Sequence, residues 1–72
     1  MKYLIFREVP KRTKTKYIQV FNTSERYMGH ISYFNYWRRY CFWPESDRVF
    51  DVNCLHEIIK KIDELMEERV KK

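Results

Sequence analysis

The stretch DVNCLHEIIKKIDELMEERV, residues 51–70, decides the fold of this 72-residue chain. Asp51 and Asn53 are both candidate N-caps, because their side chains can accept hydrogen bonds from the free amides of a first helical turn. Glu57 and Lys61 have the i, i+4 spacing of a helical ion pair. The apolar residues recur every three or four positions, the period of an amphipathic helix: Val52, Leu55, Ile58, Ile59, Ile62, Leu65, Met66 and Val70. We therefore predict one helix over residues 51–70.

The residues before this helix follow the pattern of short strands separated by turns. Pro10 and Pro44 each end an apolar or aromatic run, since proline cannot donate a ladder hydrogen bond. Gly29 marks a bulge or a close backbone approach within the third run. The expected strands are Tyr3–Val9, Tyr17–Phe21, Tyr27–Tyr33 and Tyr36–Trp43, with a short final one at Arg48–Phe50. The predicted fold class is α+β, an antiparallel sheet of about four strands with one C-terminal helix packed on one face, in a single domain over residues 1–72.

Length and composition exclude several classes of protein. No stretch approaches the 18 or so apolar residues of a membrane span, and the apolar run at residues 3–6 is too short for a signal-peptide core. We therefore expect a cytoplasmic protein, inside the host cell if it is viral. Abundant Lys and Glu with a single Gln are typical of thermophile proteins. A chain of this size buries only about 60% of its unfolded surface, which leaves little room for a large substrate cavity.

Positive charge and aromatic residues coincide along the chain. Residues 1–50 hold 10 Lys and Arg against 4 Asp and Glu, whereas residues 51–72 hold 5 against 6. All 13 aromatic residues also lie within the first 50. One helix covers only one face of a sheet, so the basic and aromatic sheet is expected to present its other face to water or to a partner.

The stretch ISYFNYWRRYCFWP, residues 31–44, is the most unusual in the chain, with seven aromatics among its fourteen residues. Side chains alternate along a strand. One face of the Tyr36–Trp43 strand therefore carries Trp37, Arg39, Cys41 and Trp43, and the other carries Tyr36, Arg38, Tyr40 and Phe42. Which of the two faces meets the helix is left open. Aromatic rings stack on unpaired bases and arginines neutralise phosphates, so this stretch favours a nucleic-acid surface. The alternative is that these rings fill the core of a small protein that lacks alanine.

A basic connection, KRTKTK at residues 11–16, precedes the second strand and can follow a phosphate backbone or remain a solvated loop. The predicted function is non-catalytic binding of nucleic acid, with DNA and RNA both open. The predicted binding residues are Lys11, Arg12, Lys14, Lys16, Tyr36, Arg38, Arg39 and Tyr40. The second hypothesis is a protein-binding module on the same face, either an inhibitor of a host complex or a homodimer.

Metal binding and catalysis have little support. Cys41, Cys54, His30 and His56 show no CxxC or HxxxH spacing, and no cofactor is expected. The sequence contains no Ser-His-Asp order, and its single glycine excludes a glycine-rich phosphate loop. We interpret both cysteines as small core residues where the helix start meets the fourth strand, and leave open whether they are bonded.

One pattern of residues leads from the aromatic stretch into the acidic amphipathic helix. It consists of Ile31, Tyr33, Trp37-Arg38, Tyr40-Cys41-Phe42 and Pro44, followed by Val49-Phe50 and Cys54-Leu55. This pattern resembles a family of small proteins encoded by phages, plasmids and other mobile elements. The resemblance spans about residues 28–66 and departs at Asn35-Tyr36, where the family tends to have Gly-Pro. It implies a mobile-element origin and intracellular action, and no catalytic activity.

Overall fold

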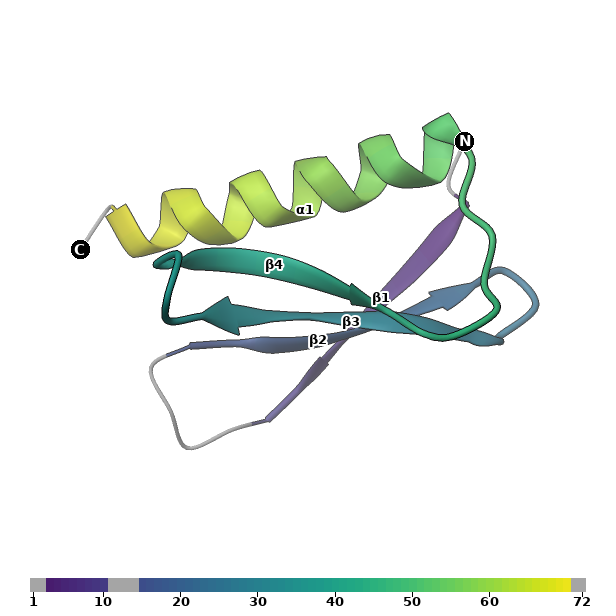
Figure 1. Ribbon diagram of the computed structural model, residues 1–72, viewed down its shortest axis with the longest axis horizontal. Coiled ribbons are helices and arrows are strands. Elements are labelled where there is room, and N and C mark those ends of the chain that lie inside the picture. Colours follow the sequence, from purple (N-terminus) through teal and green to yellow (C-terminus); the bar gives the residue numbers. More distant parts are fainter. Residues whose placement is uncertain (1–2, 11–14, 71–72) are drawn as a thin grey trace.

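The computed structural model describes residues 3–10 and 15–70 and confirms the predicted α+β fold. Its strands form one antiparallel sheet in the order β1-β2-β3-β4, and the helix α1 follows them. The elements are β1 Leu4–Val9, β2 Tyr17–Asn22, β3 Tyr27–Phe34, β4 Arg39–Pro44 and α1 Val52–Val70. Figure 1 shows α1 lying along one face of the sheet above β4, with no described element covering the other face.

The core forms between α1 and every second residue of the strands. Ile18 and Val20 of β2 and Ile31 of β3 are almost fully buried there, and Ile58 and Leu65 of the helix pack onto them. Among the residues whose side chains are described, the buried apolar ones are Leu4, Ile18, Val20, Met28, Ile31, Tyr40, Ile58 and Leu65. Because these residues hold the fold together, the face of the sheet under the helix is closed to a large ligand.

Gly29 allows β3 and β4 to approach closely next to a bulge. Its φ is 146°, and a Cβ atom at this position would clash with the backbone oxygen of Trp43. The register with β2 shifts here, since Val20 pairs with Gly29 while the next residue, Phe21, pairs with Tyr27. Both expectations for the single glycine, a bulge and a close approach, are therefore confirmed.

The fourth strand begins at Arg39, so the prediction that it begins at Tyr36 was wrong. Residues 35–38 form a turn in which the amide of Trp37 donates to the Phe34 carbonyl and that of Arg38 to the Asn35 carbonyl, each at 3.2 Å. Tyr and Trp favour strands, but the chain must reverse between β3 and β4. The short strand predicted at Arg48–Phe50 does not form either.

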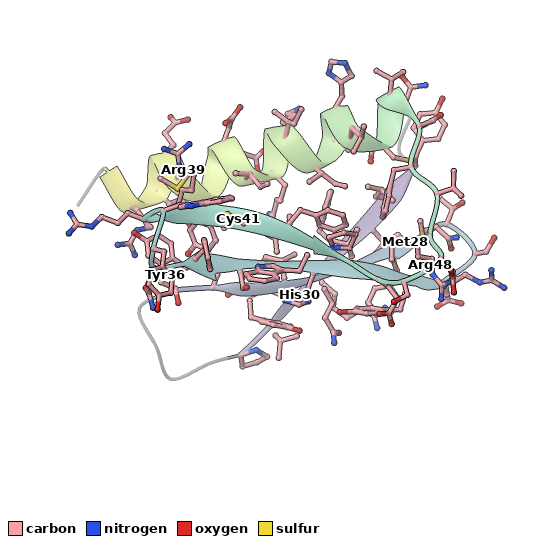
Figure 2. All side chains as sticks on the ribbon, in the orientation of Figure 1. Met28, His30, Tyr36, Arg39, Cys41 and Arg48 are labelled. Carbon is pink, nitrogen blue, oxygen red and sulfur yellow. The ribbon has the colours of Figure 1, made fainter. Side chains whose placement is uncertain are left out.

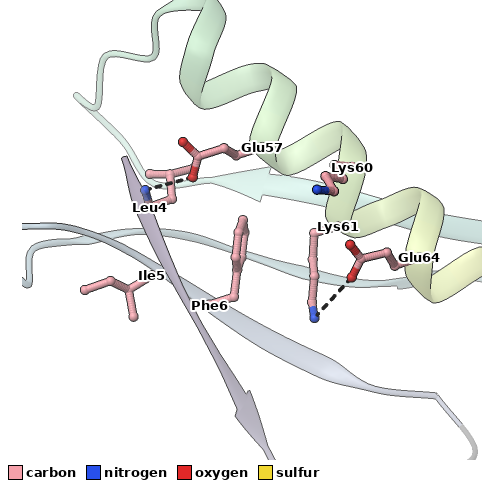
Figure 3. Close-up of a pocket in the computed structure, with 7 residues that line it drawn as sticks. All are labelled: Leu4, Ile5, Phe6, Glu57, Lys60, Lys61 and Glu64. Carbon is pink, nitrogen blue, oxygen red and sulfur yellow. Dashed lines mark hydrogen bonds and ion pairs between the residues drawn. The ribbon is translucent and has the colours of Figure 1, made fainter. Parts of the chain in front are cut away.

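Hydrogen bonds fix α1 at both of its ends. Asp51 is the N-cap, because its carboxylate Oδ1 accepts the amide of Cys54 at 2.9 Å. The Glu57 carboxylate accepts the amides of Tyr3 and Leu4 at 2.7 and 3.0 Å, and Figure 3 shows the bond to Leu4. Towards the other end of α1, the amide of Tyr40 donates to the sulfur of Met66 at 3.3 Å. The helix is thus tied to β1 on one side and to β4 on the other.

Candidate nucleic-acid interface

The face of the sheet away from α1, here called the open face, carries the residues that alternate with the core. The register places Arg7, Gln19, His30 and Trp43 next to one another, in a row across all four strands. Figure 2 shows His30 on the side of the sheet away from the helix. The remaining open-face positions, by alternation and register, hold Ile5, Val9, Tyr17, Phe21, Tyr27, Ser32, Phe34, Arg39 and Cys41.

Aromatic rings on the open face contact one another from β2 to the turn after β3. Tyr17 stacks on His30 with 4.8 Å between ring centroids, and His30 stacks on Trp43 at 5.9 Å. Phe34 packs edge-on against Trp43 at 5.5 Å and against Trp37 at 5.0 Å. We call these residues, Tyr17, His30, Phe34, Trp37 and Trp43, the aromatic cluster. Their mutual contacts hold the rings in place, which would lower the entropy lost if a ligand bound them.

The most exposed rings of the described chain lie in the turn at one end of this cluster. Tyr36 is 90% exposed and Trp37 is 65% exposed. Phe34 supports both, with ring centroids 5.6 Å and 5.0 Å away. An apolar groove of about 260 Å³ opens next to the turn, lined by Phe34, Trp37, Cys41, Phe42 and Trp43. Exposed aromatic rings beside an apolar groove can stack on an unpaired base.

The strand positions of the open face hold arginines and no carboxylate. The guanidinium of Arg7 lies 5.0 Å from the centroid of the Phe21 ring, and Nε of Arg39 donates to the Trp37 carbonyl at 3.4 Å. Glu8 is the one acidic residue within the four strands, and its position alternates to the helix side of β1. A phosphate that approaches the open face therefore meets positive charge without a strand carboxylate beside it.

The predicted basic loop contributes less than expected among the described residues. Lys11, Arg12 and Lys14 lie outside them. Lys16 lies on the helix side, where its Nζ is 2.7 Å from Oε1 of Glu68. The hydrogen bond to this carboxylate raises the pKa of Lys16, and the same bond lowers the pKa of Glu68. The charge of Lys16 is thus balanced within the protein.

The predicted residues of the aromatic stretch separate into two groups. Tyr40 is only 3% exposed, and its hydroxyl accepts the amide of Lys16 at 2.9 Å. The prediction that Tyr40 contributes to the binding surface was wrong, because a ring buried under the helix cannot stack on a base. Tyr36 and Arg38 lie in the turn and not on the face of a strand with Tyr40. Both are exposed, and Figure 2 shows Tyr36 at the same end of the sheet as Arg39, which begins β4.

Sequence reasoning missed most of the aromatic cluster. Ile18, Val20 and Ile31 are apolar residues that face the core from β2 and β3. Because side chains alternate along a strand, this apolar pattern could have placed the neighbouring Tyr17 and His30 on the opposite face. The contacts of Trp43 with both His30 and Phe34 depend on the register between β3 and β4, which the sequence does not specify.

The two cysteines are free and lie on different sides of the sheet. Cys54 packs against the core, and its burial raises the pKa of its thiol. Cys41 lies on the open face beside the groove, so the interpretation of Cys41 as a core residue was wrong. Within residues 3–10 and 15–70, no three His, Cys, Asp or Glu side chains gather as metal ligands. The helix of this described part is too polar to cross a membrane.

A second hollow, of about 650 Å³, lies between β1 and α1 (Figure 3). Its lining residues are Leu4, Ile5, Phe6, Glu57, Lys60, Lys61 and Glu64. The carboxylate of Glu57 is occupied by backbone amides, and Nζ of Lys61 is 4.0 Å from Oε1 of Glu64. Its acidic and basic residues balance, so this hollow has no preference for a ligand of either charge.

No protein-family model, curated protein or solved structure matches this chain. The resemblance to mobile-element proteins therefore stays a prediction, and what the open face binds has to be inferred from its own side chains.

Proposed function

We propose that this protein is a small non-catalytic module that binds single-stranded nucleic acid on the open face of its sheet. The observation that supports this most is the pre-assembled aromatic cluster, flanked by arginines on strand positions that hold no carboxylate. Sheets that display exposed aromatic rings stack bases in several families of RNA- and single-strand-binding folds.

Each group of side chains has a separate role in this proposal. The exposed rings of Tyr36 and Trp37 stack on bases, and each stacked base contributes about 1–3 kcal/mol. Arg7, Arg38 and Arg39 neutralise phosphates along the face. Stacking does not distinguish one base from another, because every base has a π-face. The module is therefore expected to bind DNA or RNA with little sequence preference.

Fluorescence anisotropy of a labelled single-stranded oligonucleotide tests the proposal. Three arginine–phosphate contacts predict that log K falls with log salt at a slope near −2, so affinity drops about 20-fold between roughly 50 and 200 mM salt. Absence of binding at micromolar protein in low salt would end the proposal.

Variants locate the site on the open face. Trp37→Ala should weaken binding about tenfold through lost stacking, and the double variant Arg38→Ala/Arg39→Ala should also make the salt slope shallower by about 1.4. Lys60→Ala is the matched control, because Lys60 is an exposed cation on the helix. If Lys60→Ala weakens binding as much as the arginine variants, the attraction comes from overall charge and the open face is not the site.

A protein partner on the same face is the second candidate. Exposed Tyr, Trp and Arg are the residue types that dominate binding energy in protein interfaces, and Tyr36, Trp37 and Arg39 supply all three. Such a partner is an inhibited host complex or a second copy joined through this face. This alternative predicts no oligonucleotide binding at any salt concentration, so the same titration separates the two candidates.

A further inference from the structure

The helix carries apolar side chains that the sheet leaves exposed. Val52, Leu55 and Ile59 are 62%, 44% and 55% exposed, although each belongs to the apolar stripe of α1. Ile62 and Met66 continue the same line towards the C-terminus and are half-buried. A soluble monomer gains nothing from a row of exposed aliphatic side chains, and such rows mark interaction surfaces.

This row points sideways from the helix, towards the β4 edge of the sheet. Ile58 and Leu65 are buried and define the direction of the core. Successive residues of a helix are rotated by about 100° around its axis. Since Ile58 faces the core, Ile59 faces the side of the helix and not directly away from the sheet. Met66 identifies this side as that of β4, because its sulfur contacts the amide of Tyr40, whereas Glu57 binds β1 on the opposite side.

The edge of β4 itself is poorly suited to receive another strand. The amide of Tyr40, which points away from β3, is already bound to the sulfur of Met66 at 3.3 Å. Pro44 ends the strand and has no N–H to donate. An edge blocked in this way resists strand addition. The partner of this side of the molecule therefore has to pack on the helix.

We propose that a second copy of this chain packs there, with the two α1 helices antiparallel and crossing at Ile59. The row is self-complementary about this residue. Val52 and Met66 lie seven positions to either side of Ile59, and Leu55 and Ile62 lie four and three positions to either side. A two-fold axis through Ile59 therefore pairs every apolar residue of one helix with an apolar residue of the other.

Charge complementarity also favours the antiparallel arrangement. His56 and Asp63 are exposed and border the row on its outer side. They lie three and four positions from Ile59, so antiparallel helices place each His56 beside the partner's Asp63. There an imidazole N–H can donate to a carboxylate. Parallel helices would instead place identical side chains opposite one another.

The geometry also orients the two sheets. Side-by-side antiparallel helices are related by a two-fold axis perpendicular to the plane that contains both helices. Since α1 lies flat on its sheet (Figure 1), this axis is roughly normal to both sheets. The two open faces then point in the same direction and remain uncovered. This dimer does not depend on what the open face binds.

Sedimentation velocity over a range of concentrations tests the dimer by mass action. The wild-type mass should rise from the 9.1 kDa of one chain towards twice that value as concentration increases. Ile59→Glu should remain monomeric throughout, because it buries two facing carboxylates at the axis. Lys60→Glu is the matched control, with the same new side chain one residue along, and should dimerise like the wild type. A wild type that stays monomeric at millimolar concentration, or an Ile59→Glu variant that still dimerises, overturns the proposal.

Two further experiments do not depend on the folding of Ile59→Glu. His56→Asp and Asp63→His should each weaken the dimer about fivefold, and the double variant should restore it by exchanging the two partners. Mild oxidation should cross-link Ile59→Cys into a dimer much faster than Lys60→Cys, with the wild type giving the background from its native cysteines. If the double variant does not restore the dimer, and Ile59→Cys and Lys60→Cys cross-link at the same rate, the contact between the two copies lies elsewhere.

Discussion

Arg38 has a backbone conformation that arginine rarely adopts. Its φ is 54°, in the left-handed region, where a residue with a Cβ atom is strained by about 1–2 kcal/mol relative to the right-handed one. The turn from β3 to β4 imposes this conformation, and glycine would adopt it without strain. An exposed arginine at such a position stabilises nothing in the described fold, while it adds a cation next to Trp37. The proposed function gives this strained position a role, because glycine could adopt the turn but could not supply a cation.

Arg38→Gly should therefore stabilise the protein and weaken its binding. We expect the free energy of unfolding in urea to rise by about 0.5–1 kcal/mol, and the affinity for single-stranded oligonucleotide in low salt to fall about three- to fivefold. Glu25→Gly is the control, because Glu25 has a similar φ of 64° in the turn between β2 and β3, at the other end of the sheet. Glu25→Gly should stabilise the fold without weakening binding. Equal affinity of Arg38→Gly and the wild type would remove Arg38 from the site.

Among the elements, the helix was the most predictable from sequence. Its apolar residues follow the 3.6-residue period over five turns, and Asp51 is one of the two N-caps expected, so the predicted range 51–70 differs from Val52–Val70 by one residue. The first three strands were also predicted to within about a residue at each end, because Pro10 and the polar turns delimit them.

The fourth strand was less predictable because both of its faces are aromatic. Alternation alone cannot decide whether Tyr40 or Trp43 is buried. The decision comes from pairing with β3, where the fully buried Ile31 lies opposite Phe42 and places Phe42 and Tyr40 on the helix side. The same pairing forces residues 35–38 into a turn, although Tyr36 and Trp37 have high strand propensity. Long-range register, which no local pattern encodes, therefore determines which rings form the candidate site.

The N-cap of the helix makes its stability dependent on pH. Hydrogen bonds from the amide and thiol of Cys54 lower the pKa of the Asp51 carboxyl. A carboxyl whose pKa is lower in the folded state stabilises the protein fully above the unfolded-state pKa, near 4, and loses this effect as pH falls through the folded-state value.

Asp51→Asn tests this contribution, since asparagine is an equally good N-cap without a charge. The wild type should have a higher melting temperature than Asp51→Asn at pH 7, and the difference should shrink as pH falls below the unfolded-state pKa near 4. Asp47→Asn is the control, because Asp47 is an exposed carboxyl in the turn before the helix and outside both proposed surfaces. A difference between wild type and Asp51→Asn that persists unchanged at low pH would show that charge at the cap has no role.

At the scale of the whole molecule, the fold separates two kinds of surface. Several aromatic rings that the core does not use lie on the open face and in the turn beside it, together with Arg7, Arg38 and Arg39, whereas the exposed Val52, Leu55 and Ile59 lie on the β4 side of the helix. Neither surface covers the other. The proposed dimer therefore leaves both open faces available and directs them the same way, so that one nucleic-acid strand can contact two modules. Joining two sites increases affinity without any new contact to the ligand, provided that the strand is long enough to reach both.

Binding as a function of oligonucleotide length tests this arrangement. A probe of about 6 nucleotides fits one module, and wild type and Ile59→Glu should bind it equally, because Ile59 belongs to α1, which packs on the other face of the sheet. A probe of about 30 nucleotides can cross two modules, and the wild type should bind it at least tenfold more tightly than Ile59→Glu does. Lys60→Glu should behave as the wild type with both probes. If Ile59→Glu gains as much affinity from the longer probe as the wild type does, each module acts alone and the two open faces do not share a strand.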